Sequence, residues 1–151
     1  TLRYLTFEKA RFGEDRIGVT VDIDEEVEDT LVPAFVIQPL VENAVRHAMG
    51  DEDPLHIDIS VVPERESMVQ IQVKDDGVGM DEQTAARLFC TQQKAPRTDA
   101  PQGGGAGVAM HNIADRIARF YGPRSSTQVI SSPGAGTSVV LHLDLQKSIL
   151  E

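Results

Sequence analysis

Two glycine-containing segments constrain most what this chain can fold into. Residues 75–79 read Asp-Asp-Gly-Val-Gly and follow a strand-like run, while residues 103–108 read Gly-Gly-Gly-Ala-Gly-Val and lead into a helical pattern. A third segment, residues 38–47, places polar side chains on one face of an otherwise apolar helix. Backbone amides at a helix N-terminus favour phosphate. Together the three segments predict a nucleotide pocket.

The apolar residues follow two periods, one typical of strands and one typical of helices. Alternation predicts strands at 16–23, 55–62, 69–73, 127–131 and 137–145, and helical spacing predicts helices at 4–12, 33–49, 82–89 and 108–121. The second and third strands are expected to form an antiparallel hairpin. Because strands and helices do not alternate strictly, the order argues against a doubly wound parallel sheet. We predict an α+β two-layer sandwich, with helices on one face of a mixed, mostly antiparallel sheet.

Three of these segments carry more specific expectations. In the strand at 16–23, the apolar residues at odd positions from Ile17 to Ile23 share one face, which predicts a half-buried strand. Pro39 either kinks the helix at 33–49 or marks its true first turn. The polar stretch 91–104 is rich in Pro, Gly and Gln. A long loop of this kind in a compact domain is a functional lid or a disordered segment.

The charge balance argues against one class of partner. The chain has 151 residues, with 24 acidic against 14 basic residues and a net charge of -10, and sequence-blind binding of nucleic acid depends on neutralising phosphate with cations. The nearly apolar stretch 31–41 is shorter than the ~20 residues that span a bilayer, so this fragment is not expected in the membrane. Cys90 is the sole cysteine, which excludes a disulfide framework and favours a reducing, cytoplasmic setting.

Asn43, Arg46 and His47 stand at helical positions i, i+3 and i+4, so they share one face. An amide oxygen such as that of Asn43 suits magnesium, which is usually shared with substrate phosphates. Arg46 is placed to contact those phosphates, and His47 to donate to a ribose or phosphate oxygen. The alternative is that the three residues form the solvated side of an amphipathic helix.

Asp75 ends a strand whose alternating residues point to the core. An ionised carboxylate is a pure acceptor, suited to an exocyclic amine such as that of adenine. Gly77 and Gly79 lack side chains where a planar base would have to pass close to the backbone. An ordinary Asp-Gly turn is the alternative.

The glycine run at 103–107 does not fit the better-known phosphate patterns. It lacks G-x-x-x-x-G-K-[ST], and Met110 occupies the last glycine position of G-x-G-x-x-G counted from Gly105. A flexible linker is one interpretation. The other is an anion site, since the glycines lead directly into a helix whose N-terminus favours negative charge.

With these residues in view, the chain resembles the ATP-binding catalytic domain of sensor histidine kinases, within the superfamily that also holds gyrase, heat-shock chaperone and MutL ATPases. More narrowly, it is similar to the LytS-type kinases. Their signature Q-P-L-V-E-N-A-x-x-H matches residues 38–47 at every fixed position. Three further matches are R-F-G-x-x-R at 11–16, the glycine box followed by Asn112 and Arg116, and G-x-G-T at 134–137.

The resemblance implies a Bergerat ATP-binding fold and roles for individual residues. Asn43 would hold Mg²⁺, Glu42 would position a metal water, and Arg46 and His47 would line the phosphate and sugar side of ATP. Asn43, Glu42 and Arg46 are thereby the candidate catalytic group.

The remaining expected ATP contacts lie in later segments of the chain. Asp75 would read the adenine amine, with Gly77 and Gly79 beside it and Thr137 supporting Asp75. The phosphates would be held by the backbone of Gly105, Ala106, Gly107 and Val108.

The same resemblance implies a division of the parent protein. Residues 1–12 would be the stub of a helix connecting to a dimerisation and phosphoacceptor domain, and residues 13–151 the ATP-binding domain, with a lid at about 80–107. The histidines at positions 47, 56, 111 and 142 do not lie on a long dimerising helix, so the phosphoacceptor histidine is expected outside this fragment. A response regulator would be an indirect partner. Whether the parent is anchored in the inner membrane is left open.

Three functions are compatible with these residues. The first is a kinase domain that binds Mg-ATP and transfers its γ-phosphate to a histidine on a separate domain. The second is a non-catalytic ATP-sensing module that makes protein contacts. The third is an ATPase of the gyrase or MutL kind, but Pro39 occupies the place where those relatives carry a water-activating carboxylate, so hydrolysis should be slow.

Overall fold

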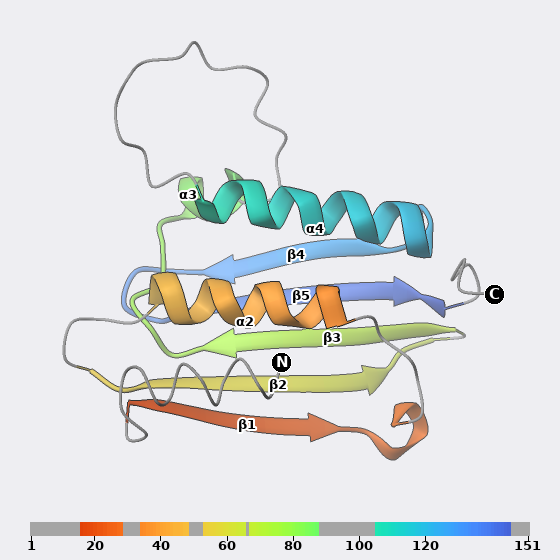
Figure 1. The fold of residues 1–151 in the computed structure, drawn as a ribbon, viewed down its shortest axis with the longest axis horizontal. Helices are drawn as coiled ribbons and strands as arrows, with labels where there is room; N and C mark the ends of the chain where they lie inside the picture. Colours follow the sequence, from red (N-terminus) through yellow and green to blue (C-terminus); the bar gives the residue numbers. More distant parts are fainter. Residues whose placement is uncertain (1–15, 29–33, 49–52, 66, 88–104, 146–151) are drawn as a thin grey trace, which may run out of the picture.

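Five strands, three α-helices and one short 3₁₀ helix make up the described part of the chain (Figure 1). The computed structural model describes residues 16–28, 34–48, 53–65, 67–87 and 105–145. In chain order the elements are β1 (Ile17–Ile23), η1 (Glu25–Val27), α2 (Ala34–Ala48), β2 (Leu55–Pro63), β3 (Met68–Asp75), α3 (Glu82–Arg87), α4 (Gly105–Tyr121), β4 (Ser126–Ser131) and β5 (Thr137–Asp144).

The strands β2 and β3 form the hairpin that the alternating pattern predicted. They pair antiparallel, with Ile59 opposite Val73 and Val61 opposite Ile71. All four of these side chains are buried. Since side chains alternate between the two faces of a strand, one face of the hairpin is apolar and the other polar.

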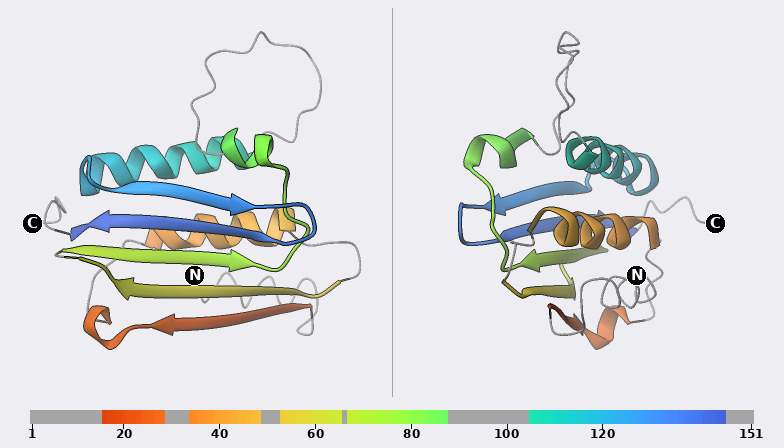
Figure 2. Two further views of the ribbon diagram at one scale, coloured as in Figure 1. Left: turned by 180° about the vertical axis from the view of Figure 1, so that it is seen from behind. Right: turned by 60° about the vertical axis from the view of Figure 1, so that its left-hand side comes forward.

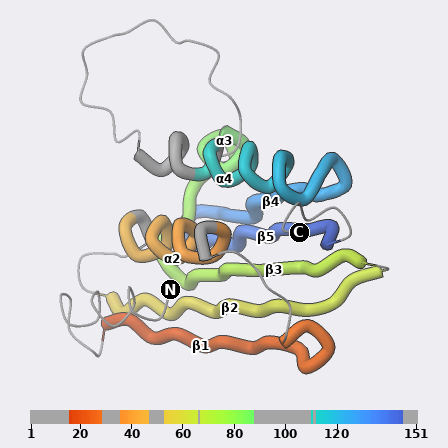
Figure 3. The backbone as a smooth tube through the Cα atoms, turned by 45° about the vertical axis from the view of Figure 1, so that its right-hand side comes forward, coloured from red at the N-terminus to blue at the C-terminus, as the bar shows by residue number. Residues whose placement is uncertain are grey.

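The sheet order is β1-β2-β3-β5-β4. β1 pairs parallel with β2, and the other three pairs are antiparallel, which confirms the mixed, mostly antiparallel sheet. A parallel pair needs a crossover connection, and α2 is the helix within it. Figure 3 shows α2 running along the sheet next to β3, on the path that leads from β1 back to β2.

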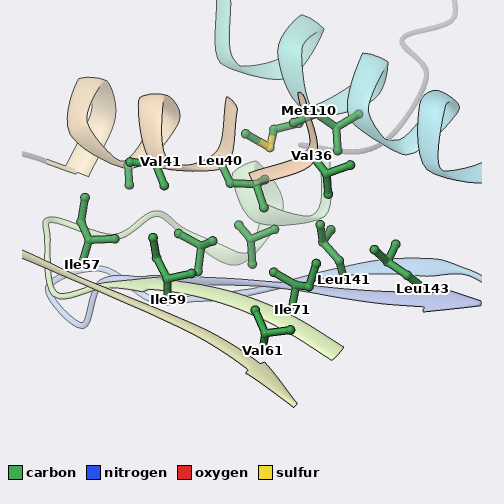
Figure 4. Packing of buried hydrophobic residues seen from close by; sticks show 14 of the residues in the cluster. Val36, Leu40, Val41, Ile57, Ile59, Val61, Ile71, Met110, Leu141 and Leu143 are labelled. Carbon is green, nitrogen blue, oxygen red and sulfur yellow. The ribbon is translucent and has the colours of Figure 1, made fainter. Parts of the chain in front are cut away.

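The helices α2 and α4 lie on the same face of the sheet (Figure 2). Val36, Leu40 and Val41 of α2 and Met110 of α4 meet the apolar side chains of the central strands (Figure 4). Burying an aliphatic side chain of this size contributes about 1.5–3 kcal/mol relative to leaving it exposed. The predicted two-layer α+β sandwich is therefore confirmed.

Two helix boundaries differ from the sequence prediction. α4 begins at Gly105 rather than Val108, so part of the glycine run is helical. Packing of its buried stripe, which includes Met110 and Ile113, outweighs the cost of about 1 kcal/mol that glycine adds per helical position. Pro39 lies inside α2, so the alternative that it marks the first turn is wrong. Because proline has no backbone N–H, the helical hydrogen bond from residue 39 to the carbonyl of Phe35 is not made.

The uniform half-buried face expected for β1 is also wrong. Ile17 is 1% exposed, whereas Val21 and Ile23 are 47% and 46% exposed. β1 lies at the edge of the sheet, and α2 packs over β2, β3 and β5. The covered face therefore ends partway along β1.

Several expectations fall on residues outside the described ranges. These are the helix at 4–12, Cys90, the last residues of the helix at 82–89 and the polar stretch 91–104. The boundary at residue 13 and the lid at about 80–107 stay predictions. Of the helices that the structure describes, none is both long and apolar enough to cross a membrane.

Candidate functional site

Three polar side chains cross the sheet in a row at one end of its helix-covered face. Asp75 pairs with Thr137 across β3 and β5, and Ser131 pairs with Thr137 across β4 and β5. Each stands two positions from a valine of its own strand that lies in the core or packs against it, so all three point toward the helices. We call these residues the polar row.

Asp75 is the charged member of the polar row, and it is only 5% exposed. The backbone amides of Gly77 and Thr137 donate to its Oδ1 atom over 3.0 and 3.2 Å. Burial raises the pKa of the Asp75 carboxyl above its usual value, although these two hydrogen bonds oppose the shift. Neither bond uses Oδ2, so a second acceptor atom remains for a ligand.

Two glycines hold the backbone around Asp75. Gly79 has φ of +67°, and a Cβ there would come within 2.0 Å of the Ser132 carbonyl oxygen. Gly136 has φ of +76°, and a Cβ there would come equally close to the Asp75 carbonyl oxygen. At Gly79 the missing side chain thus makes room for the protein's own backbone, and the expectation that Gly79 also lies beside a base stays a prediction.

The helix α2 supplies the second side of the site. The Oδ1 atom of Asn43 is buried and has no hydrogen-bond partner among the described residues. Glu42 is oriented by Gln38, whose Nε2 donates to Glu42 Oε1 over 2.9 Å. Arg46 is exposed, and the side chain of His47 lies outside the described set.

The unpartnered oxygen of Asn43 also bears on whether the site suits magnesium. A buried amide oxygen without a partner costs free energy unless a ligand or ion satisfies it. Magnesium prefers oxygen ligands and usually keeps waters and substrate phosphates in its shell. Within the described ranges, no group of three His, Cys, Asp or Glu side chains could hold a metal ion. The unpartnered Asn43 oxygen suits a magnesium ion whose other ligands would come from phosphate and water.

The helix α4 supplies the third side. Its first residues are Gly105, Ala106, Gly107 and Val108. The first four amides of an α-helix have no partner within the helix, and they favour an anion. In Figure 1 the start of α4, the end of α2 and the end of β3 lie on the same side of the molecule, and the reversed view in Figure 2 agrees. The fold thereby brings the three predicted segments to one end.

A shallow hollow of about 360 Å³ lies behind the polar row. Its side chains from Gln72, Lys74, Ile130 and Ser138 alternate away from the helices, so it opens on the helix-free face of the sheet. Asp75, Ser131 and Thr137 also line the hollow, so it adjoins the polar row from the opposite face of the sheet.

Two of the four histidines have described side chains, and both lie on that helix-free face. His56 Nε2 is 2.7 Å from Thr20 Oγ1 and 3.1 Å from Asp58 Oδ1. His142 Nδ1 is 2.9 Å from the Glu64 carboxylate. Both histidines stand on strands, on the opposite face of the sheet from the polar row.

Ser131 and Gln38 were missed as site residues from the sequence. Ser131 is the last residue of its predicted strand, and pairing it with Thr137 across the 132–136 turn would have pointed to it. Gln38 stands one helical turn before Glu42, which is the spacing of a side-chain pair.

Comparison with known proteins gives a consistent result. Residues 14–147 match the family model described as "Histidine kinase-, DNA gyrase B-, and HSP90-like ATPase". The chain is 34% identical over 137 residues to the sensor protein LytS of Bacillus anthracis, covering 90% of this chain and 22% of that protein. It is 30% identical over 148 residues to the sensor histidine kinase YesM of Bacillus subtilis, covering 97% and 23%. The chain thus spans less than a quarter of the length of these relatives.

Solved structures share the fold at low sequence identity. The histidine kinase domain of the blue-light activated kinase from Erythrobacter litoralis EL346 superimposes with a TM-score of 0.62 at 18% identity, covering 95% of this chain and 58% of that one. Full-length ShkA in complex with AMPPNP gives a TM-score of 0.64 at 16% identity, covering 95% and 29%. The predicted fold class is confirmed by these likenesses.

Proposed function

The chain belongs to the histidine kinase-, DNA gyrase B- and HSP90-like ATPase family, and on that premise we propose that it is the ATP-binding catalytic domain of a sensor histidine kinase. It binds Mg-ATP and presents the γ-phosphate to a histidine on another domain of the parent protein. The observation that carries the proposal is the buried Asp75 carboxylate, held by two amides at the end of an otherwise apolar face.

Asp75 reads the adenine base. Its Oδ1 atom is occupied by backbone amides, so Oδ2 is the atom that accepts from the exocyclic amine. A carboxylate accepts but does not donate when ionised, which favours adenine over a base that carries a carbonyl at the same position. Thr137 supports this geometry because its amide donates to Asp75.

The phosphates lie between α2 and the start of α4. The amides at Gly105 to Val108 bind them from one side, and the exposed Arg46 from the other. Asn43 Oδ1 would hold a magnesium ion, which would neutralise phosphate charge when bound. Glu42, oriented by Gln38, would hold a water of that ion, and His47 would line the sugar and phosphate side.

The phosphoacceptor histidine belongs to the parent's dimerisation domain. His56 and His142 stand on strands on the helix-free face, a position from which neither could meet a γ-phosphate held between α2 and the start of α4. The phosphoryl group would pass from that domain to a response regulator. Because the domain depends on a supply of ATP, it would lie in the cytoplasm.

The test is an ATP titration with and without magnesium, followed by a transfer assay. Wild type should bind more tightly with magnesium, and Asn43→Ala should lose most of that difference. Radiolabelled Mg-ATP should then label the separately supplied dimerisation domain of the parent. Equal affinity with and without magnesium would remove the role of Asn43. Tight binding without transfer would favour the alternative, a non-catalytic ATP-sensing module.

A further inference from the structure

The hydroxyl of Ser131 makes three short contacts at the end of β4. It lies 2.8 Å from the Gly136 carbonyl oxygen, 3.0 Å from the Met80 amide nitrogen and 2.8 Å from the Thr137 hydroxyl. These partners come from the turn before β5, from the segment before α3 and from β5 itself. Ser131 therefore joins the segment before α3, which is distant in sequence, to the turn before β5 and the first residue of that strand.

The chemistry of the partners fixes the direction of each bond. A carbonyl oxygen only accepts, so Ser131 gives its single proton to Gly136. A backbone amide only donates, so one lone pair of Ser131 receives Met80. The remaining lone pair can only accept, and Thr137 is thereby the donor in the Ser131–Thr137 contact. All three bonding positions of the serine hydroxyl are then used.

The consequence falls on Thr137. Once its proton points to Ser131, its hydroxyl oxygen can offer only lone pairs to other groups. Thr137 stands beside Asp75 in the polar row, and Asp75 also presents an acceptor. The row then offers acceptors alone to the site. A ligand group with two donor hydrogens, such as an exocyclic amine, satisfies it, whereas a carbonyl oxygen does not.

We infer that Ser131 is a positioning residue that determines base specificity. It holds the Thr137 hydroxyl so that Thr137 donates to Ser131, and this favours a purine that carries an amine. This rests on the proposed function, because it requires the purine to lie at the polar row. Ser131 acts through Thr137 and needs no contact with the nucleotide.

The measured quantity is the ratio of the dissociation constants for ITP and ATP. ITP carries a carbonyl oxygen where ATP carries the amine. A variant that is only less stable lowers the competent fraction equally for both nucleotides, so the ratio is unaffected. Wild type should prefer ATP. Ser131→Ala should lower that preference about tenfold, the effect of one misdirected hydrogen bond, and Ser131→Thr, which keeps the hydroxyl, should restore it.

A matched control is Ser138→Ala. Ser138 lies next to Thr137 on β5 but faces the other way, where it bonds Gln72 Nε2 over 2.6 Å, so its removal should leave the ratio at the wild-type value. If Ser131→Ala does not fold, Thr137→Val should show the same loss and Thr137→Ser should retain the preference.

The outcomes separate this inference from the proposed function. Wild type without a preference for ATP, or a preference that survives in Asp75→Ala, would overturn base reading at the polar row and the inference with it. A preference that depends on Asp75 but is unchanged in Ser131→Ala, or in Thr137→Val where that variant is used, would overturn the role of Ser131 alone.

Discussion

Gly136 lies directly against the backbone of Asp75: a Cβ on Gly136 would come within 2.0 Å of the Asp75 carbonyl oxygen. The turn before β5 is thereby locked to the end of β3. Since Thr137 follows Gly136 and donates to the Asp75 side chain, this close approach also sets the position of the buried carboxylate.

Replacing Gly136 by alanine should therefore cost more than replacing its neighbour Gly134. Both have a positive φ, of +76° and +77°, but a Cβ on Gly134 would meet nothing within 4 Å. We expect Gly134→Ala to lower the free energy of unfolding by about 1–2 kcal/mol, the cost of a left-handed alanine. Gly136→Ala should lower the free energy of unfolding by about 2–4 kcal/mol, because the cost of overpacking against the Asp75 backbone is added to that of the left-handed alanine. Urea unfolding measures both, and equal losses would contradict the close approach.

The two isoleucines at the ends of β1 should differ in a similar way. Ile17 is 1% exposed and Ile23 is 46% exposed. Ile17→Ala should destabilise the domain by about 2–5 kcal/mol, as is typical of a buried aliphatic side chain. Ile23→Ala should cost about 1 kcal/mol, since much of that side chain already contacts water. Chemical denaturation of the two variants provides the comparison. Similar losses would mean that the end of β1 is covered.

The hydroxyl of Tyr121 should be dispensable for stability. The residue is 1% exposed, its hydroxyl oxygen has no hydrogen-bond partner among the described residues, and burial raises the pKa of the phenol. An unpaired buried hydroxyl carries a desolvation cost of about 1–3 kcal/mol. Tyr121→Phe should therefore raise the free energy of unfolding by about 1 kcal/mol, whereas Tyr121→Leu should lower it. A destabilised Phe variant would show that the hydroxyl has a partner.

Asp75 should make stability depend on pH with a definite sign. Burial raises the folded-state pKa of its carboxyl above 3.8. The folded protein then holds the proton more tightly than the unfolded chain does. The resulting stabilisation is complete below pH 3.8 and is lost as the pH rises through the folded-state value.

The comparison variant is Asp75→Asn, which keeps an acceptor for the two amides but cannot ionise. Its stability relative to wild type should increase as the pH rises from below 3.8 to neutrality, then level off. Urea unfolding at a series of pH values measures this difference. Asp22→Asn, at an exposed position of β1, corrects for the loss of one charge. A relative stability that falls with rising pH would contradict a raised pKa.

The sheet could be predicted from the sequence because its strands alternate cleanly. The β2–β3 hairpin has apolar residues at every second position and polar ones between them, so its faces and its pairing follow from the pattern. The parallel pairing of β1 and the loss of cover at Val21 and Ile23 could not be predicted, because they depend on where α2 crosses the sheet.

The site was predictable in part for the same reason. Asp75 stands at the end of an alternating strand, and its position on the helix-covered face follows from the period. The functions of Gly79 and Ser131 depend on contacts across the 132–136 turn, which no periodicity reports. The start of α4 was misplaced because glycine is a poor helix former, while the packing that compensates is a tertiary effect.

The central claim is that the buried carboxylate at the end of β3 binds the nucleotide base, and calorimetric titration of ATP in magnesium tests it most directly. The variants are Asp75→Ala and, as a matched removal of an exposed carboxylate, Asp22→Ala. The account predicts that the dissociation constant for ATP rises ten- to a hundredfold in Asp75→Ala, which is roughly the effect of losing one hydrogen bond to a charged group. It should stay at the wild-type value in Asp22→Ala. A folded Asp75→Ala that binds ATP as tightly as wild type would contradict it.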